Sequence, residues 1–517
     1  MASAHSGDPP HPQEAVLRFL GDPRTHGVFE PVVRIDTAGA VVFLAGRDAY
    51  KVKRAVKFPF MDLSTLDKRR RACEQEIAVN RANAPGVYLG APPIARKGDS
   101  FEIGGRGEVV EWAVHMRRFD ESATLDRLAE KYGLSDAIID RLALAVRRSH
   151  ALAPPRDAIR AAHALETYIE QNDAAFAEWP DLFDPVKARR LTQDSRLAFA
   201  VTRPVLLTRG ELGFVRRCHG DLHLRNIAML DGEPTLFDAV EFSDEIASGD
   251  VLYDLAFLLM DLEQRGMRRA ANRLFNRYLA PEAPAAMAGL AALPLFMSVR
   301  AAIRAKVEAA AADRVNGAVK DETRALARGY FDRAAEFLRY VAPRLLAIGG
   351  LSGAGKSALA GAVAPGLGRA PGALWLRSDV ERKALFGIEE TARLPDSAYA
   401  QEVSSQVYRR IDEKARLALV AGQSVALDAT FSSAADRQAV SEIAAEVGVE
   451  LHGLFLDAPL DTRLARIARR GPDASDADAA VARRQRADPL GERGWKTIDA
   501  SGSLRETIAL ARMRLGV

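Results

Sequence analysis

The chain has 517 residues, which is too long for a single hydrophobic core, so two or three domains are expected. Hydrophobic residues make up 48% of it, and 72 basic side chains nearly balance 69 acidic ones, which argues against a nucleic-acid or membrane partner. Two cysteines exclude a disulfide framework and favour a reducing cytoplasmic environment, and the N-terminal residues do not have the pattern of a secretory signal.

The first part of the chain has the pattern of a polar tail followed by a β-rich region. Residues 1–14 are polar and proline-rich, and a disordered tail is predicted there. Apolar and β-branched residues predict strands between Val32 and Val56 and again over Val109–Phe119. Between them, Leu66–Ala84 has helical spacing and ends at a Pro-Gly pair.

Helical patterns dominate the next part of the chain. They cover Asp126–Lys131, Ser135–Ala151, Asp157–Ala177 and Val251–Tyr340, and Thr235–Phe237 is a short predicted strand. The uncharged stretch Ala283–Val299 is interrupted by two prolines and is too short to span a membrane, so a buried helix is predicted. A β-rich region followed by a helical one predicts an α+β two-lobed kinase-like domain over residues 15–342, with lobes of about 15–118 and 119–342.

A polar motif interrupts the helical region. Its sequence is CHGDLHLRN over residues 218–226, and it places Asn226 five residues after Asp221. Together with LFDAVEF at 236–242 and DVLYDLA at 250–256, it resembles the aminoglycoside phosphotransferase family. The resemblance implies that Asp221 orients an acceptor hydroxyl and that Asn226 and Asp238 hold Mg²⁺, while Asp254 fixes the loop without reacting. The H-R-D and D-F-G motifs of protein kinases are replaced here, which favours small-molecule acceptors.

The same resemblance implies that the β-rich lobe supplies a lysine to the ATP phosphates and a helix glutamate that holds this lysine. Lys51 and Lys53 lie two residues apart on one predicted strand and so share a face, which leaves both open; Lys51 is preferred. On the following helix Glu76 is preferred over Glu74.

The pattern changes near residue 342. Short apolar runs predict buried strands, with helices between them, at Leu345–Ile348, Ala373–Leu376, Ser424–Leu427 and Leu451–Leu456. Strands that alternate with helices predict an α/β domain with a parallel sheet over residues 343–517.

A glycine-rich loop follows the first of these strands and reads GLSGAGKS over residues 350–357, a full G-x-x-x-x-G-K-S motif. Such a loop binds nucleotide phosphates through its backbone N–H groups and the N-terminus of the next helix. The predicted nucleotide-binding residues are Gly350, Ser352, Gly353, Ala354, Gly355, Lys356 and Ser357. Lys356 is expected to reach the β- and γ-phosphates, and the Ser357 hydroxyl is expected to hold Mg²⁺.

Two carboxylates and a group of arginines complete this predicted site. Asp379 follows the second strand, where it can accept a proton from a substrate hydroxyl, and Asp428 ends the third strand, where it can hold Mg²⁺ through water. Arg463, Arg466 and Arg470 are predicted to form a mobile lid that clamps phosphate, and a solvated helix face is the alternative.

Residues 345–517 resemble the small P-loop kinases, a group that includes gluconate kinase, zeta toxin and related AAA-domain kinases. The whole chain resembles bacterial fusions of an aminoglycoside phosphotransferase-like domain with an ATP-binding domain. The resulting hypothesis is a bifunctional kinase that uses ATP and Mg²⁺ on small-molecule hydroxyls, with Asp221, Asp379 and Lys356 as catalytic residues. The alternatives are a single kinase regulated by its nucleotide-binding partner domain, and a toxin-like or protein-directed kinase. The acceptors, the choice of ATP or GTP and the oligomeric state stay open.

Overall fold

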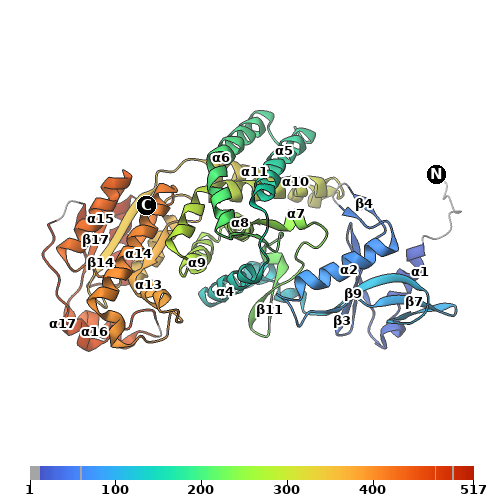
Figure 1. Cartoon of the computed structure of the whole chain (residues 1–517), viewed down its shortest axis with the longest axis horizontal. Coiled ribbons are helices and arrows are strands. Elements are labelled where there is room, and N and C mark those ends of the chain that lie inside the picture. The colour runs from blue at the N-terminus through green and yellow to red at the C-terminus, as the bar shows by residue number, and fades with distance from the viewer. Residues whose placement is uncertain (1–11, 59–60, 472, 492–493, 517) are drawn as a thin grey trace. The chain divides into compact units, whose positions relative to one another are not determined.

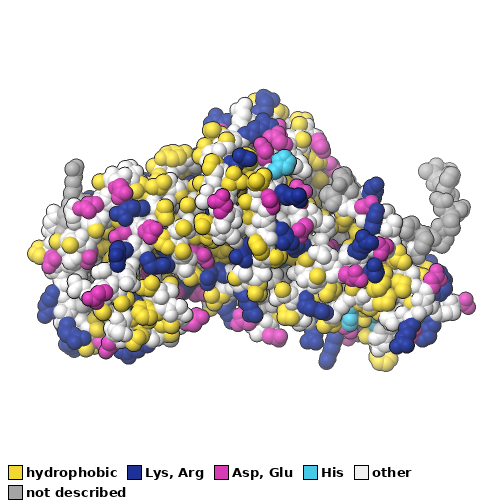
Figure 2. Space-filling model, in the orientation of Figure 1, with side chains coloured by type: hydrophobic (Ala, Val, Ile, Leu, Met, Phe, Trp, Pro, Cys, Tyr) yellow, Lys and Arg dark blue, Asp and Glu magenta, His cyan; other side chains and the backbone are white. Residues whose placement is uncertain are grey.

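The computed structural model describes residues 12–58, 61–471, 473–491 and 494–516 (Figure 1). Its contacts form two compact units, one of Met1–Arg156 with Val215–Asp254 and one of Asp157–Phe214 with Leu255–Val517. This division differs from the one predicted near residue 342, because most helices of the predicted second lobe belong to the same unit as the C-terminal domain. On the face shown in Figure 2, basic and acidic side chains are interspersed.

The predicted N-terminal tail is only partly described. Residues 1–11 lie outside the described residues, and helix α1 begins at Pro12 and ends at Leu20, so the prediction of disorder is wrong for residues 12–14. The Gln13 side chain explains this order, because its Nε2 donates to Glu111 Oε2 at 2.7 Å and to the Lys53 carbonyl at 2.8 Å.

The first unit contains a seven-stranded antiparallel sheet in the order β1-β2-β3-β9-β7-β8, with β6 paired to β9. The strands are β1 (Val33–Asp36), β2 (Ala40–Ala45), β3 (Asp48–Lys53), β6 (Tyr88–Gly90), β7 (Pro93–Lys97), β8 (Ser100–Ile103) and β9 (Val109–Arg117). Helix α2 (Leu66–Asn80) packs on this sheet through buried Cys73, which belongs to one hydrophobic cluster with Tyr88 and Val114. The predicted strands and helix are confirmed, whereas the β7–β8 hairpin was not predicted.

The rest of the first unit carries the predicted catalytic loop between short elements. They are β4 (Lys57–Phe58), β5 (Met61–Asp62), η2 (Glu121–Ala123), α3 (Leu125–Tyr132), α4 (Asp136–Leu152), β10 (Val215–Arg217), η3 (Leu224–Asn226), β11 (Ile227–Leu230), β12 (Glu233–Leu236), α7 (Asp244–Ala247) and β13 (Ser248–Asp250). The strands β10 and β13 pair with each other, and so do β11 and β12. Helix α8 (Val251–Gln264) then runs in sequence from the first unit into the second.

The second unit begins with helices. They are the α-helices α5 (Ala158–Glu178), α6 (Pro185–Glu211), α9 (Arg268–Leu279), α10 (Leu293–Ala312) and α11 (Gly317–Leu338) and the 3₁₀ helix η4 (Pro284–Ala292). Among the described residues, Pro284–Ala312 alone is long and apolar enough to cross a membrane, and 78% of its most apolar window is buried in the protein. The predicted buried helix is therefore confirmed, with a 3₁₀ first part.

The C-terminal part of the second unit is a five-stranded parallel sheet in the order β15-β16-β14-β17-β18, and it confirms the predicted α/β fold. The strands are β14 (Arg344–Gly350), β15 (Leu374–Arg377), β16 (Val425–Asp428), β17 (Glu450–Asp457) and β18 (Trp495–Asp499), of which β18 was not predicted. The helical elements between and after them are α12 (Lys356–Val363), η5 (Ala364–Gly366), α13 (Ser378–Leu385), η6 (Asp396–Tyr399), α14 (Gln401–Val420), α15 (Ala434–Val447), α16 (Leu460–Arg469), α17 (Ala479–Arg484) and α18 (Leu504–Leu515).

Strand β15 lies at one edge of this sheet, and helix α9 covers it. Asn272 Nδ2 and Asn276 Nδ2 both donate to the Ala373 carbonyl, at 3.0 and 3.1 Å, and Asn276 Oδ1 accepts the Trp375 N–H at 2.6 Å. Two asparagines one helical turn apart thus satisfy backbone groups that an edge strand otherwise leaves unpaired. The P-loop sheet and the preceding helices therefore form one packed body.

Candidate active sites

A buried glutamate organises the predicted lysines of the first unit. Glu76 is fully buried, and its Oε1 lies 2.9 Å from Lys51 Nζ while its Oε2 pairs with Lys53. Lys51 also reaches Asp238 Oδ1 at 2.8 Å, whereas Lys53 pairs with Glu241. Lys51 is therefore the lysine that joins the α2 glutamate to the predicted metal ligand Asp238. Burial alone would raise the pKa of Glu76, but the two ammonium groups outweigh it and hold that pKa below its usual value.

The alternative glutamate has a different environment. The Glu74 side chain is 52% exposed and lies 3.9 Å from Arg70, one turn earlier on α2. Such an exposed pair contributes little. The structure therefore brings Glu76, and not Glu74, to the lysines of β3.

Asp238 has a strained backbone that side chains of the β-rich region support. Its φ of 60° lies in the left-handed region, which aspartate tolerates better than most residues. The Asp238 N–H donates to Tyr88 Oη at 3.0 Å, and the Ala239 N–H donates to Asn80 Oδ1 at 2.8 Å. The Lys51 ammonium lowers the pKa of Asp238, so this carboxylate is charged at neutral pH. Tyr88 and Asn80 were not predicted, since neither residue type marks a contact with a distant loop.

The catalytic loop holds Asp221 with one side open to solvent. Asn226 Nδ2 donates to both the Asp221 carbonyl and its Oδ2, each at 3.0 Å, and His223 Nε2 lies 3.3 Å from the same Oδ2. The Asp221 side chain remains 41% exposed, so its carboxylate can accept a proton from an incoming hydroxyl. With its amide nitrogen bonded to Asp221, Asn226 offers its amide oxygen, and with Asp238 it fits the oxygen ligands that Mg²⁺ prefers.

Asp254 anchors this loop, as predicted. Its Oδ1 accepts the Gly220 N–H at 2.8 Å, and its Oδ2 lies 3.3 Å from the His219 nitrogen and 3.1 Å from His150 Nε2. The side chain is only 2% exposed, so it cannot contact a substrate. Asp254 therefore positions the catalytic loop by accepting hydrogen bonds from the backbone N–H groups of His219 and Gly220.

We expect Asp254→Asn to lower the kcat of the first unit's activity by about tenfold to a hundredfold, since one carboxylate–N–H bond of about 1–3 kcal/mol is lost where an amide nitrogen faces a donor. Steady-state kinetics check this. Asp181→Asn is the control, because Asp181 is 69% exposed and forms a surface ion pair with Arg324. A variant with wild-type kcat would show that the loop keeps its position without this carboxylate.

The phosphate-binding loop of the second unit needs its glycines. Gly350, Gly353 and Gly355 have φ values of 141°, 84° and 101°, which disfavour other residues. A Cβ on Gly353 would lie 2.6 Å from the Arg463 carbonyl, and one on Gly350 would lie 2.8 Å from the Leu456 carbonyl. The loop leads into α12, which begins at Lys356, so its N–H groups and the helix N-terminus act together on an anion.

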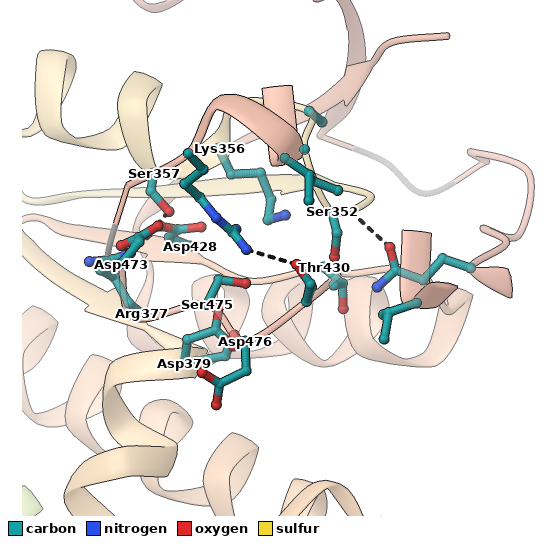
Figure 3. Close-up of a pocket in the computed structure, with 18 of the residues that line it drawn as sticks. Ser352, Lys356, Ser357, Arg377, Asp379, Asp428, Thr430, Asp473, Ser475 and Asp476 are labelled. Carbon is teal, nitrogen blue, oxygen red and sulfur yellow. Dashed lines mark hydrogen bonds and ion pairs between the residues drawn. The ribbon is translucent and has the colours of Figure 1, made fainter. Parts of the chain in front are cut away.

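A cavity of about 920 Å³ opens beside this loop, and all of the predicted loop residues from Ser352 to Ser357 line it. Lys356, Asp379 and Asp428 come from different elements and lie around the same space (Figure 3). Burial lowers the pKa of Lys356 and raises the pKa of Asp379, whose carboxyl is also hydrogen-bonded to Ser475. The structure therefore brings together the predicted phosphate-binding and acceptor-activating groups.

The predicted metal ligands of this site are adjacent. Asp428 Oδ2 is buried without a hydrogen-bond partner and lies 3.6 Å from Arg377 Nε. The Ser357 hydroxyl accepts a long hydrogen bond from Arg377 Nη2 at 3.4 Å. A buried carboxylate oxygen without a hydrogen bond, next to a serine hydroxyl, fits a Mg²⁺ site.

Arg377 lines the same cavity but was not predicted as a site residue. Its guanidinium lies 2.9 Å from Glu390 Oε1 and 2.8 Å from Asp473 Oδ1, in addition to its contacts with Asp428 and Ser357. A signal was available, because Arg377 is the last residue of β15 and the carboxyl ends of parallel strands face the ligand.

The three predicted lid arginines divide into two groups. Arg463 is buried and donates to the carbonyls of Ala458, Ser352 and Ala482, at 3.2, 3.4 and 3.4 Å, so it supports the loop from below and the prediction of a mobile clamp is wrong for it. Arg466 and Arg470 line the cavity. The sequence could not show that Arg463 packs against the phosphate-binding loop, because this depends on the folded position of Ser352.

The raised pKa of Asp379 gives a prediction for pH dependence. If its carboxylate accepts the proton of the acceptor hydroxyl, activity falls as pH drops through the pKa of Asp379. That pKa lies above the ordinary value of 3.8, so the acid limb of kcat/KM lies at higher pH than for a solvated aspartate. A pH–rate profile of the Lys356-dependent activity checks this, with Asp379→Glu as the comparison. An acid limb near 3.8 would exclude the buried carboxyl as the base.

Comparisons with known proteins match both parts of the chain. A family model described as "Phosphotransferase enzyme family" matches residues 104–290, and one described as "AAA domain" matches residues 345–489. An uncharacterized protein of Mycobacterium tuberculosis is 31% identical over 494 residues, covering 93% of this chain and 95% of the relative, and one of Mycobacterium bovis has the same values.

Solved structures with similarity to single parts of the chain include two kinases. A choline/ethanolamine kinase family protein from Mesorhizobium loti is 15% identical with a TM-score of 0.37, and the match covers 63% of this chain and 94% of that one. A sugar kinase from Janibacter is 18% identical with a TM-score of 0.26, and the match covers 34% and 95%.

Proposed function

The chain belongs to the family of these mycobacterial proteins and joins a phosphotransferase region to a P-loop kinase-type region, so we propose that it is a bifunctional ATP-dependent kinase. Each half transfers the γ-phosphoryl group of ATP to the hydroxyl of a small molecule. One observation carries this proposal: each unit holds both a lysine suited to bind phosphate and a carboxylate suited to activate an acceptor. They are Lys51 and Asp221 in the first unit and Lys356 and Asp379 in the second. A domain that only binds a nucleotide needs no such carboxylate.

In the first unit the side chains have separate tasks. Lys51, which Glu76 holds in place, binds the ATP phosphates. The half-exposed Asp221 carboxylate receives the proton of the acceptor hydroxyl as its oxygen attacks the γ-phosphorus. Asn226 and Asp238 would hold Mg²⁺, which when bound neutralises charge on the phosphates. Asp254 holds the backbone of the catalytic loop, and with it Asp221, in position for this attack.

In the second unit the loop N–H groups and Lys356 bind the phosphates, and Arg466 and Arg470 line the same cavity, where they can neutralise charge on the transferred group. Asp379 receives the proton of the second acceptor. Ser357 and Asp428 would hold Mg²⁺ here. The cavity of about 920 Å³ is large enough for a nucleotide together with a small acceptor.

The experiment compares wild type, Lys356→Ala and Asp221→Asn against a library of sugars, nucleosides and aminoglycosides, with ATP consumption and product mass as readouts and circular dichroism as the control for folding. We expect each substitution to abolish phosphorylation of a different acceptor and to leave the other reaction intact. If either substitution alone stops all turnover in a folded protein, the halves act as one coupled kinase and the bifunctional proposal is wrong.

A further inference from the structure

Strand β3 of the first unit carries two lysines with different partners. Lys51 Nζ contacts Glu76 Oε1 and Asp238 Oδ1, and the Lys51 side chain is 17% exposed. Lys53 Nζ contacts Glu76 Oε2 and Glu241 Oε1, and the Lys53 side chain is 4% exposed. The proposed reaction uses Lys51 to bind the ATP phosphates, but it gives no task to Lys53 or Glu241.

The side chains form one chain of ion pairs with alternating charge, in the order Asp238, Lys51, Glu76, Lys53 and Glu241. Both ends of this chain lie on the short segment of residues 238–241, whereas its middle lies on β3 and α2. Two separate lysines therefore attach the segment that carries the proposed metal ligand Asp238 to the β-rich sheet.

Solvent exposure decides which of these contacts a ligand can replace. The Lys51 and Asp238 side chains are 17% and 47% exposed, so a nucleotide can reach the contact between them. The Lys53 and Glu241 side chains are only 4% and 9% exposed, so their contact is shielded from a ligand. Burial alone would lower the pKa of Lys53, but Glu76 and Glu241 outweigh it and raise that pKa, so Lys53 is charged at neutral pH.

Packing alone gives no reason for a charged pair at this place. Buried ion pairs lose their hydration, and apolar side chains of similar volume are often equally stabilising. An ion pair does fix the position of its partners, because Lys53 balances its buried charge against Glu76 and Glu241. The pair therefore fixes where residue 241 lies relative to β3, and with it the position of Asp238 three residues earlier.

We propose that Lys53 and Glu241 are a positioning pair that keeps Asp238 at the nucleotide site when Lys51 leaves it to bind the ATP phosphates. The inference rests on the proposed kinase function of the first unit. In the structure Lys51 contacts Asp238 directly. When Lys51 turns to phosphate, Asp238 would hold Mg²⁺, and the contact of Glu241 with Lys53 still joins its segment to β3.

The test is isothermal titration calorimetry on the full chain carrying Lys356→Ala, which weakens the P-loop site so that the heat reports the first unit. AMP-PNP is titrated once with EDTA and once with excess Mg²⁺, and the ratio of the first dissociation constant to the second measures what the metal contributes to binding. We expect Lys53→Met to lower this ratio by about fivefold or more. Lys53→Arg, which can contact both carboxylates, is expected to keep the ratio of the parent protein.

The ratio distinguishes positioning from a simple effect of charge. Removing the Lys53 ammonium leaves more negative charge around Asp238, which by itself would strengthen metal binding and raise the ratio. Lys97→Met is the matched control, because Lys97 lies on β7 of the same sheet, is 68% exposed and pairs with Glu102. If circular dichroism shows that Lys53→Met is unfolded, the double variant Lys53→Met/Glu241→Met takes its place. It keeps the net charge and fills the space, and the same fall is expected.

Each outcome bears on the positioning pair. A lower ratio in Lys53→Met, with the parent's ratio in Lys53→Arg and Lys97→Met, supports it. An unchanged or higher ratio in Lys53→Met, or an equal fall in Lys97→Met, overturns it and leaves the proposed function standing. If the Lys356→Ala parent does not bind AMP-PNP at all, the proposed function of the first unit is wrong, and this inference is wrong with it.

Discussion

Replacing Glu76 with alanine is expected to lower the free energy of unfolding of the first unit by about 3–5 kcal/mol, which is the usual cost of removing one partner from a buried ion pair. Glu76 is fully buried between Lys51 and Lys53, and the Lys53 side chain is only 4% exposed. Without the carboxylate, two ammonium groups repel each other away from water. The folded fraction that remains is expected to lose most of its phosphoryl-transfer activity, because Lys51 keeps only its bond to Asp238 and is no longer fixed from the side of α2.

Urea unfolding and steady-state kinetics measure both effects. Glu74→Ala is the matched control, since this residue is on the same helix, is 52% exposed and should change stability by no more than about 0.5 kcal/mol. Glu76→Gln keeps the shape and removes the charge, which separates electrostatics from packing. A Glu76→Ala protein as stable as the Glu74→Ala protein would refute the assigned role.

Replacing Arg377 with methionine is expected to reduce kcat/KM of the P-loop activity on the order of a hundredfold. The guanidinium is 12% exposed and has carboxylate partners in Glu390 and Asp473 as well as the nearby Asp428. Methionine fills the space but leaves these negative charges uncompensated beside the ATP phosphates. Their repulsion raises KM for ATP, and the altered Ser357 environment lowers kcat.

Steady-state kinetics with varied ATP check this prediction, and the activity that depends on Asp221 should be unchanged. The control is Arg416→Met, because Arg416 is 40% exposed and pairs with Glu446, which is 60% exposed. Wild-type kinetics for Arg377→Met would mean that the charges at the end of β15 do not act on the nucleotide.

Local pattern predicted the elements that carry the chemistry. The G-x-x-x-x-G-K-S loop, the strands around it and the five-residue spacing of Asp221 and Asn226 depend on neighbours in sequence, and the structure has them where the sequence analysis placed them. The kinase-type assignment of both regions is supported by the two family models.

Features that depend on distant contacts could not be predicted. Sequence spacing could not choose between Glu74 and Glu76, because burial on α2 depends on how the helix meets the sheet. Arg463 shares a helix with Arg466, yet its guanidinium packs beneath the loop, since the closed Ser352 backbone offers it a carbonyl. The start of helix α1 could not be predicted, because Gln13 is held by Lys53 and Glu111, which lie 40 and 98 positions further along the chain.

The docking of α9 on β15 has a consequence for how such proteins evolve. A recombination breakpoint at residue 342 follows the boundary of the nucleotide-binding fold, but it would leave the Ala373 carbonyl and the Trp375 N–H without the asparagines that satisfy them. Exchange of the P-loop part between genes must therefore carry α9 with it or replace this helix. The unit that must be inherited together is therefore larger than the nucleotide-binding fold and includes α9.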